Sequence, residues 1–320
     1  MADSSAQSTA PRLGKGIVLK NLNHILFVTD GLDDDTGGIT ATLRLARAGS
    51  ARITILLLFP ALPVAMRDYQ EPYEAGLRGQ LEERLNAAAA ALGHSISSFD
   101  LNIVLDSEPN PAFRVIHHAE ATSCDLVLKQ AQTVEAGRGF RAQDMVLLRK
   151  CPCPLWLHRP PKNPDRPRVA VAIDPEPEDE QAQELPLRLL KVGSELALSF
   201  GRRLNIVTCW DYPFANYLGR NAWYRVSEEE TATIVRAVKN KNAAALEALI
   251  ARSGIDSPYT IRHIQGAPTD ILPEFVTRQD VDVLVMGTLG RSGLSGLLIG
   301  NTCEDIMRQL DCSVFALKPV

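Results

Sequence analysis

The chain has 320 residues, of which 45% are apolar and 22% are charged, and its formal net charge is −4. This length allows two domains of ordinary size, each with its own core. The small negative charge offers no general attraction for phosphate backbones, so nucleic acid is not expected as a main partner. No apolar run approaches the roughly 18 residues that a membrane span requires, so membrane insertion is not expected either.

The first residues, MADSSAQSTAPRLGKG, are small and polar and lack the apolar core of a secretory signal. We therefore expect a disordered tail over residues 1–20 and a cytoplasmic protein. Six cysteines in a chain without an export signal should be reduced thiols. Cys151-Pro-Cys153 has no second cysteine pair of the kind that zinc sites use, so no metal site is expected.

A proline-rich segment separates two halves that carry the same pattern. Six prolines lie within residues 151–168, too many for a helix or a central strand, and the later part, 160–167, is expected to be a linker. On either side, NPAFRVIHHAEATSCDLVLK (110–129) aligns without a gap with APTDILPEFVTRQDVDVLVM (267–286). This internal repeat predicts a duplication, with domains at 21–159 and 168–320.

Each half alternates short apolar runs with helix-forming stretches. In chain order, the first half predicts strands at 24–30, 51–59 and 101–106, a helix at 77–92, a helix followed by a strand within 110–129, and a last helix and strand within 145–157. The second half repeats this order with strands at 168–174, 203–210 and 259–266, a helix at 228–252, a helix and strand within 267–286, and a last helix and strand within 305–317.

Strands that alternate with helices predict a parallel sheet reached by right-handed crossovers. We predict an α/β fold of two tandem, doubly wound, five-stranded parallel-sheet domains with strand order 3-2-1-4-5. A pseudo-twofold axis should relate them, with the fifth strands, which carry Trp156 and Phe315, near the contact. Such sheets bind ligands at the carboxyl ends of the strands, where the order reverses. In the second half this crevice lies between Asp174, which ends the first strand, and Gly287, which ends the fourth.

A glycine-spaced loop follows the fourth strand of the second half. Gly287, Gly290 and Gly300 precede a helix that starts at Asn301 and Thr302. Glycines allow the backbone to turn its N–H groups inward, and the N-terminus of a helix favours an anion. The spacing fits neither G-x-G-x-x-G nor the P-loop pattern. The loop therefore predicts a phosphate-binding site outside the standard dinucleotide and phosphotransferase folds.

Four segments carry a resemblance to a known family: DLVLK (125–129), LLRKCPCPLW (147–156), GTLGRSG (287–293) and IGNT (299–302). With them the chain resembles the universal stress protein family in its tandem, two-domain form. The ATP-binding members of that family carry G-x2-G-x9-G-[ST] between the fourth strand and the last helix. The resemblance covers residues 24–159 and 168–319, one family domain each, and it implies an adenine nucleotide alpha-hydrolase-like fold.

The resemblance also implies a role for each matching residue. Asp174 would contact the adenosine portion, Cys209 and Met286 would line the base, Gly287 and Gly290 would hold phosphates, and Gly300, Asn301 and Thr302 would complete the cradle. It implies ATP as ligand, with Mg²⁺ as a companion, and a binding or regulatory role in stress response. Asn301 replaces the motif's serine or threonine, and Pro175-Glu176 follows Asp174 where Asp-x-Ser is common. Glu176 would repel phosphate if it pointed inward, so a different, partly apolar ligand remains an alternative.

The first half lacks glycine at all three aligned positions, and Lys129-Gln130 follows its fourth strand. We expect no nucleotide there, and Asp30 should brace the turn at Gly31. A weak ATP hydrolase, with His263 or Asp174 orienting water, is a second hypothesis for the protein, but no grouped catalytic residues support it. A purely structural pseudo-dimer is a third. A further homodimer is left open.

Overall fold

The computed structural model describes residues 19–107, 109–132, 137–164, 166–177, 183–212, 227–288 and 300–318. The first half contains β1 (His24–Thr29), α1 (Thr36–Gly49), β2 (Arg52–Leu58), α2 (Gln70–Ala91), β3 (Leu101–Asp106), α3 (Pro111–Thr122), β4 (Leu126–Gln130), α4 (Ala142–Lys150) and β5 (Leu155–His158). The second half contains β6 (Val169–Ala172), α5 (Leu185–Ser199), β7 (Leu204–Trp210), α7 (Glu228–Ser253), β8 (Tyr259–Gln265), α8 (Pro268–Arg278), β9 (Val283–Gly287), α9 (Asn301–Met307) and β10 (Ser313–Leu317). Short 3-10 helices occupy Leu19–Asn21, Val64–Tyr69 and Ile96–Ser98.

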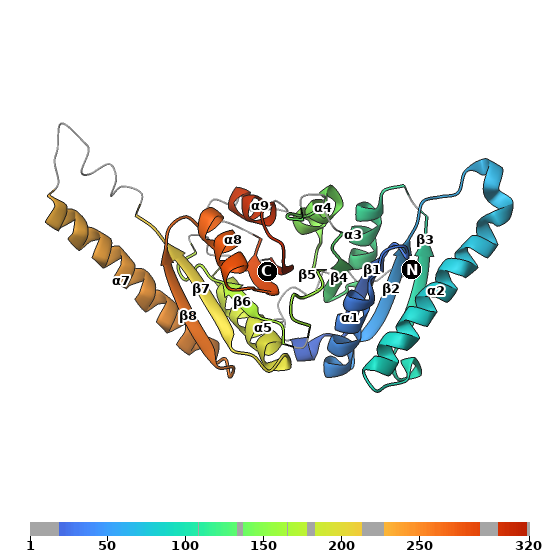
Figure 1. Ribbon diagram of the computed structural model, residues 1–320, viewed down its shortest axis with the longest axis horizontal. Helices are drawn as coiled ribbons and strands as arrows, with labels where there is room; N and C mark the ends of the chain where they lie inside the picture. The colour runs from blue at the N-terminus through green and yellow to red at the C-terminus, as the bar shows by residue number, and fades with distance from the viewer. Residues whose placement is uncertain are drawn as a thin grey trace, which may run out of the picture.

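The strands form one ten-stranded sheet in the order β3-β2-β1-β4-β5-β10-β9-β6-β7-β8. Each half therefore has the predicted order 3-2-1-4-5, and the fold prediction is confirmed. Neighbouring strands within each half are parallel, whereas β5 and β10 pair antiparallel at the centre. The halves lie side by side about this pair (Figure 1). Because the central pair is antiparallel, the carboxyl ends of the strands of the two halves point in opposite directions.

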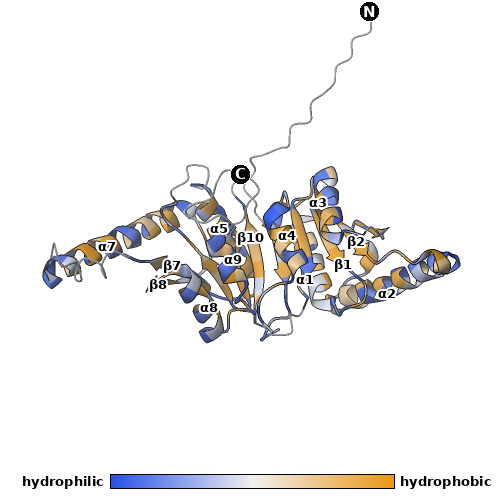
Figure 2. Ribbon diagram, turned by 90° about the horizontal axis from the view of Figure 1, so that it is seen from above, coloured by the Kyte–Doolittle hydropathy of each residue, from blue (hydrophilic) through white to orange (hydrophobic). Residues whose placement is uncertain are grey.

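Helices cover both faces of the sheet. The cluster of buried residues on one face includes side chains of α1, α2, α5 and α7, and the cluster on the other face includes those of α3, α4, α8 and α9 (Figure 1). Residues of β1 alternate between the two clusters, Ile25 and Phe27 in one, Leu26 and Val28 in the other. Seen from above, apolar strands lie between helices that carry polar residues (Figure 2). This explains why the strands read as nearly continuous apolar runs.

The two halves are held together at β5 and β10. Phe315 lies opposite Trp156 in the register, with ring centroids 5.6 Å apart. Across the same contact, Arg149 Nε lies 2.7 Å from Glu304 Oε1, and Lys318 Nζ donates to the carbonyl oxygen of Cys151 at 2.6 Å. The contact therefore combines a buried aromatic pair with polar interactions between the terminal helix and strand of each half.

Two expected boundaries differ from the structure. Leu19 is buried and its N–H donates to Glu195, so the tail predicted for 1–20 does not extend through Leu19 and Lys20; residues 1–18 lie outside the described residues. Helix α2 starts at Gln70 and not at 77. Pro72 is tolerated because it lies in the first turn, where its missing N–H has no intrahelical acceptor.

The described residues of the proline-rich segment 160–167 form neither helix nor strand. Its ends are held by Asp282, whose carboxylate accepts hydrogen bonds from the N–H groups of Lys162 at 2.6 Å and Arg168 at 2.7 Å. This links the segment directly to the start of β9. Among the described helices, none combines the length and apolarity needed to cross a membrane.

Candidate functional site

The reversal of strand order in the second half lies between β6 and β9. These strands are parallel neighbours, with Val171 opposite Val285. Asp174 and Thr288 follow Val171 and Val285 by three residues each, so they lie at the same edge of the sheet. The crevice expected between the first and fourth strands is therefore located by the topology at the carboxyl ends of β6 and β9.

Asp174 is half-buried at this edge, and its Oδ1 accepts a hydrogen bond from the N–H of Glu176 at 3.2 Å. The carboxylate of Glu176 lies 2.8 Å from Lys241 of α7. Glu176 is thus paired with a cation of the outer helix. The repulsion of phosphate that the sequence suggested for this residue is offset by that pairing.

Gly287 ends β9 where α5 approaches closely. A Cβ atom at this position would lie 2.9 Å from Leu185 Cδ2, which is closer than real Cβ contacts allow. Because Leu185 Cδ2 is the end of a flexible side chain, this packing favours glycine without requiring it. Met286 is buried in the cluster on the α8 and α9 face, and half-buried Cys209 of β7 packs against the same cluster. Since β6 separates their strands, the two residues lie on either side of it.

The two ends of the glycine loop lie together. The N–H of Gly300 donates to the carbonyl oxygen of Thr288 at 2.9 Å, so α9 starts directly beside the end of β9. Asn301 is exposed and Thr302 is half-buried in the first turn of α9. Gly290 lies outside the described residues. The structure thus brings Gly300, Asn301 and Thr302 to the edge that Asp174 occupies.

The strand registers and the aligned last helices give the equivalent positions in the first half. They pair Asp30 with Asp174, Lys129 with Met286, Gln130 with Gly287, Arg141 with Gly300, and Asp144 with Cys303. The first half therefore provides an internal comparison for every described position of the candidate site.

In the first half, side chains bridge the equivalent crevice. Arg141 donates to Gln132 Oε1 at 2.9 Å, and Gln132 Nε2 donates to Asp30 Oδ2 at 2.9 Å. Arg141 occupies the N-cap of α4 with φ −69° and ψ 162°, close to the φ −70° and ψ 145° of Gly300 at the N-cap of α9. These angles suit any residue. The backbone at position 300 would therefore tolerate a residue with a side chain, and the glycine leaves this crevice without one.

Asp30 has a second role in the first half, because its Oδ1 accepts hydrogen bonds from the N–H groups of Leu32 at 3.0 Å and Asp33 at 3.2 Å. The expected bracing of the turn at Gly31 is therefore observed. Sequence reasoning did not identify the bridge through Gln132. Its bonded partners Gln132 and Asp30 are 102 residues apart in the chain, and no local pattern marks them.

A buried ion pair lies below the bridge. Lys129 Nζ is 2.8 Å from Asp144 Oδ1, and the side chains are 13% and 0% exposed. The second half has Met286 and Cys303 at these positions, and burial raises the pKa of Cys303 to about 12, so its thiol is neutral. A charged pair in one half thus corresponds to an apolar pair in the other.

His263, considered as a residue that could orient water, takes part in structural contacts. Its Nε2 lies 3.0 Å from Asn242 Oδ1 of α7, and its ring lies 5.7 Å from that of Trp210. Burial is the main cause of its lowered pKa, so the ring is neutral at pH 7. These contacts support the structural interpretation of His263.

The thiols of the first half form a compact group. Cys153 Sγ lies 3.4 Å from Cys124 Sγ and 3.8 Å from Cys151 Sγ. Hydrogen bonding with Cys153 and burial raise the pKa of the Cys151 thiol well above its usual range, which disfavours the thiolate that metals bind. Across the described ranges, no group of three or more His, Cys, Asp or Glu residues is placed to hold a metal ion.

Comparisons with known proteins agree with this geometry. The universal stress protein family model matches residues 166–318. Universal stress protein E of Photorhabdus laumondii is 27% identical over 308 residues, which cover 94% of this chain and 96% of that relative. A Universal stress protein E homolog of Haemophilus influenzae is 30% identical over 213 residues, 66% of this chain and 67% of the relative.

The fold also has a counterpart among solved structures. A functionally unknown protein from Pseudomonas aeruginosa PAO1 superposes with a TM-score of 0.70 at 19% identity, covering 94% of each chain. The family model covers the second half, and the Photorhabdus relative aligns along nearly the whole length. The chain belongs to the universal stress protein family.

Proposed function

We propose that the domain at 168–320 binds an adenine nucleotide, ATP foremost, in the crevice between β6 and β9. The protein then acts in the cytoplasm as a nucleotide-dependent binding module in stress response. The observation that carries this proposal is the difference between the N-cap residues of α4 and α9. Arg141 of α4 reaches across the crevice of the first half, whereas Gly300 of α9, with nearly the same backbone angles, leaves the crevice of the second half without such a side chain.

The residues at this edge suit the parts of a nucleotide. Asp174 is an acceptor for the hydroxyls of the adenosine portion, and half-buried Cys209, with buried Met286 in the same apolar cluster, would line the base. The first N–H groups of α9, at Asn301 and Thr302, have no acceptor within the helix and suit phosphate oxygens. The amide of Asn301 adds donors in place of the family's hydroxyl.

The energies indicate how the contributions divide. Binding at micromolar affinity requires about 8 kcal/mol. Each exposed contact at a helix N-terminus contributes about 0.3–1 kcal/mol, so burial of the base and ribose must provide much of the rest. Mg²⁺ would be held mainly by phosphate oxygens and water, because the described residues contain no cluster that could hold a metal ion.

The domain at 21–159 should bind no nucleotide, since the Arg141–Gln132–Asp30 bridge spans its crevice. We therefore propose one site per chain. The bridge and the Lys129–Asp144 pair would stabilise this half without a ligand.

The proposal is tested by releasing the ligand of the purified protein by denaturation and identifying it by mass spectrometry. Wild-type protein should retain an adenine nucleotide, and Gly300→Arg, which introduces the residue of the first half, should lose it. Arg141→Gly is the matched control and should retain it. Absence of nucleotide from the wild type would refute the proposal, and release of an apolar compound instead would favour a structural pseudo-dimer with a different ligand.

The same preparation tests hydrolysis. We expect slow or absent turnover of added ATP with Mg²⁺, because His263, one of the two residues considered for orienting water, is held by Asn242. Turnover that persists in Asp174→Ala would indicate a contaminating enzyme. Turnover that Asp174→Ala abolishes would favour a weak ATP hydrolase over a binding module.

A further inference from the structure

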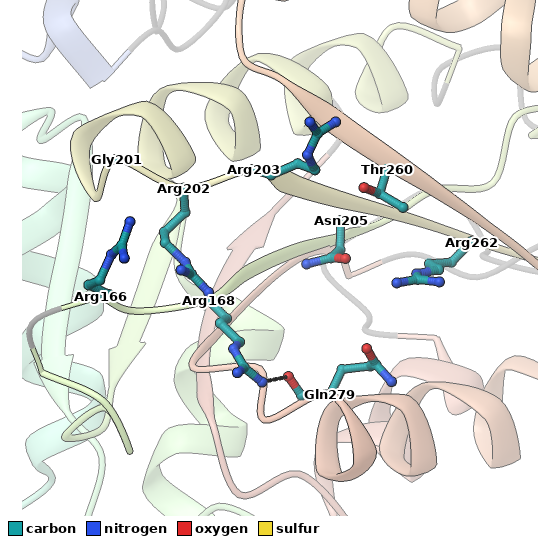
Figure 3. A pocket seen from close by; sticks show the side chains of 9 residues that line it. All are labelled: Arg166, Arg168, Gly201, Arg202, Arg203, Asn205, Thr260, Arg262 and Gln279. Atoms are coloured by element: carbon teal, nitrogen blue, oxygen red, sulfur yellow. Dashed lines mark hydrogen bonds between the residues drawn. The ribbon is translucent and has the colours of Figure 1, made fainter.

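Five arginines surround a cavity at the amino-terminal edge of the second half's sheet, opposite to the nucleotide crevice. Arg166 and Arg168 precede β6, Arg202 and Arg203 precede β7, and Arg262 lies on β8. The cavity has a volume of about 540 Å³ (Figure 3). We call it the arginine cavity. Three segments far apart in the sequence thus gather positive charge at one place.

Little negative charge within the described residues balances this cluster. Arg168 lies 3.3 Å from Asp280 and also donates to the carbonyl oxygen of Gln279 at 2.8 Å (Figure 3). No described residue that lines the arginine cavity carries a carboxylate, and no ion pair among them involves Arg166, Arg202 or Arg262. The cluster is notable because the whole chain has a net charge of −4.

The fold itself does not require these arginines. The strand registers place Leu22, His24, Ala51, Arg52 and Val104 of the first half at the positions of Arg166, Arg168, Arg202, Arg203 and Arg262. Only one of the five cations is kept. The same strands and crossovers therefore form without the cluster, which points to a role outside folding.

The first half also shows how this edge is filled when the cluster is absent. His24 Nε2 lies 2.9 Å from Thr54 Oγ1, and Arg52 lies 3.3 Å from His24 Nδ1. These side chains bind one another. In the second half, the equivalent of Thr54 is Asn205, whose side chain donates to the carbonyl oxygen of Val169 at 3.3 Å.

We propose that the arginine cavity binds a compact anion with several linked phosphate groups. Guanidinium groups are planar forks that pair with phosphate oxygens in bidentate fashion and stay charged at all physiological pH values. Several of them around one cavity suit several phosphates, and Thr260 and Asn205 add neutral polar groups to the lining. The volume lies in the range of small-ligand sites.

The lining also discriminates between kinds of phosphate ligand. No described residue of the lining is aromatic, so the arginine cavity offers no platform on which bases could stack. Recognition would therefore rest on the phosphate chain alone, whether it is inorganic polyphosphate or the phosphate end of a larger molecule. Single-stranded nucleic acid, which relies on stacking, fits less well.

The test is calorimetric titration of the full chain with inorganic tripolyphosphate at about 50 mM and about 200 mM salt. The main variant is Arg202→Ala/Arg262→Val, which introduces the residues of the first half and should therefore fold. Arg236→Gln on the exposed side of α7 is the control that removes a positive charge outside the arginine cavity. Gly300→Arg tests whether the probe binds in the nucleotide crevice instead. Thermal melts of all variants verify folding.

We expect saturable tripolyphosphate binding that weakens with salt and falls at least about tenfold in the double variant, while Arg236→Gln and Gly300→Arg bind as wild type. Orthophosphate should bind at least about tenfold more weakly than tripolyphosphate. In Gly300→Arg, ATP should bind no more tightly than tripolyphosphate, since its base gains no contact in the arginine cavity. No saturable binding to the wild type, or equal binding by the folded double variant, would overturn the proposal. So would tighter binding of a short oligothymidylate, or loss only in Gly300→Arg.

Discussion

Lys129→Met should be among the most destabilising single changes in the first half. The substitution leaves Asp144, whose side chain is fully buried, without its cation, and Asp144 Oδ2 has no hydrogen-bond partner within the described structure. Removing one member of a buried ion pair costs about 3–5 kcal/mol, because the other charge stays uncompensated. Asp144→Cys should cost less, about 2 kcal/mol, since Lys129 is 13% exposed and retains the Gln130 carbonyl oxygen at 3.2 Å.

The double variant Lys129→Met/Asp144→Cys introduces the pair found in the second half, Met286 and Cys303. Replacing both charges with well-packed neutral groups is often neutral, so its free energy of unfolding should lie within about 1 kcal/mol of the wild type. Urea unfolding of the wild type, the two single variants and the double variant gives a double-mutant cycle. The summed losses in free energy of unfolding of the single variants should exceed the loss of the double variant by about 3 kcal/mol or more.

The control for this cycle is the pair of exposed Lys162 and half-buried Asp311, 3.1 Å apart, in which Lys162→Met should cost less than about 1 kcal/mol. A loss below about 1 kcal/mol for Lys129→Met, or a double variant no more stable than Lys129→Met alone, would refute the reasoning.

Burial lowers the pKa of His158 to about 4 from 6.5, so the unfolded chain takes up the proton first as the pH falls. The neutral ring therefore contributes fully to the free energy of unfolding above pH 6.5, and about 2.5 kcal/mol of this contribution is lost at pH 4.5. Urea titrations at pH 7 and 4.5 should show that His158→Leu removes this part of the difference in stability between the two pH values. Phe315→Ala should cost about 3–5 kcal/mol in urea unfolding, because the ring is fully buried against Trp156. Arg149→Ala, at the same contact but 35% exposed, should cost about 1 kcal/mol or less, and equal losses would contradict this account of the contact. Ser227→Ala removes the capping box of α7 and should speed hydrogen exchange in its first turn, consistent with a local cost of about 1 kcal/mol; unchanged exchange would show that the cap contributes little.

The sequence predicted the strands well, although only inner strands such as β1 and β2 are buried on both faces, while the edge strands β3 and β8 are partly exposed. The runs at 101–106, 51–59 and 259–266 match β3, β2 and β8 to within one residue at each end. Alternation of strand and helix then indicated a parallel sheet with crossovers of one hand, although this rule alone allows strand orders other than 3-2-1-4-5. Helix α2 shows the limit of such patterns, since Pro72 could equally have marked a boundary as a first turn.

The joining of the halves through β5 and β10 could be anticipated only in outline. Both strands are short apolar runs, and periodicity does not tell which edge strand pairs with which, or in what register. Trp156 meets Phe315 because the edge strands of the two halves pair with each other, and that information is tertiary. The antiparallel direction follows from this pairing.

The same limit applies to the polar groups. The bridge from Arg141 through Gln132 to Asp30, the pairing of Lys129 with Asp144, and the arginine cavity join segments that the fold brings together. The net charge of −4 indicates no general attraction for phosphate backbones, but a sum over the whole chain conceals a local cluster of arginines. The gapless alignment of the halves could have shown which positions to compare.

The proposed nucleotide site is tested most directly by equilibrium dialysis of the full chain with ATP. The wild type should bind one ATP per chain, Arg141→Gly should also bind one, and Gly300→Arg should lose at least about tenfold in affinity while keeping its thermal stability. Two ATP molecules per chain, no saturable binding to the wild type, or a folded Gly300→Arg that binds ATP as tightly as the wild type would contradict the account.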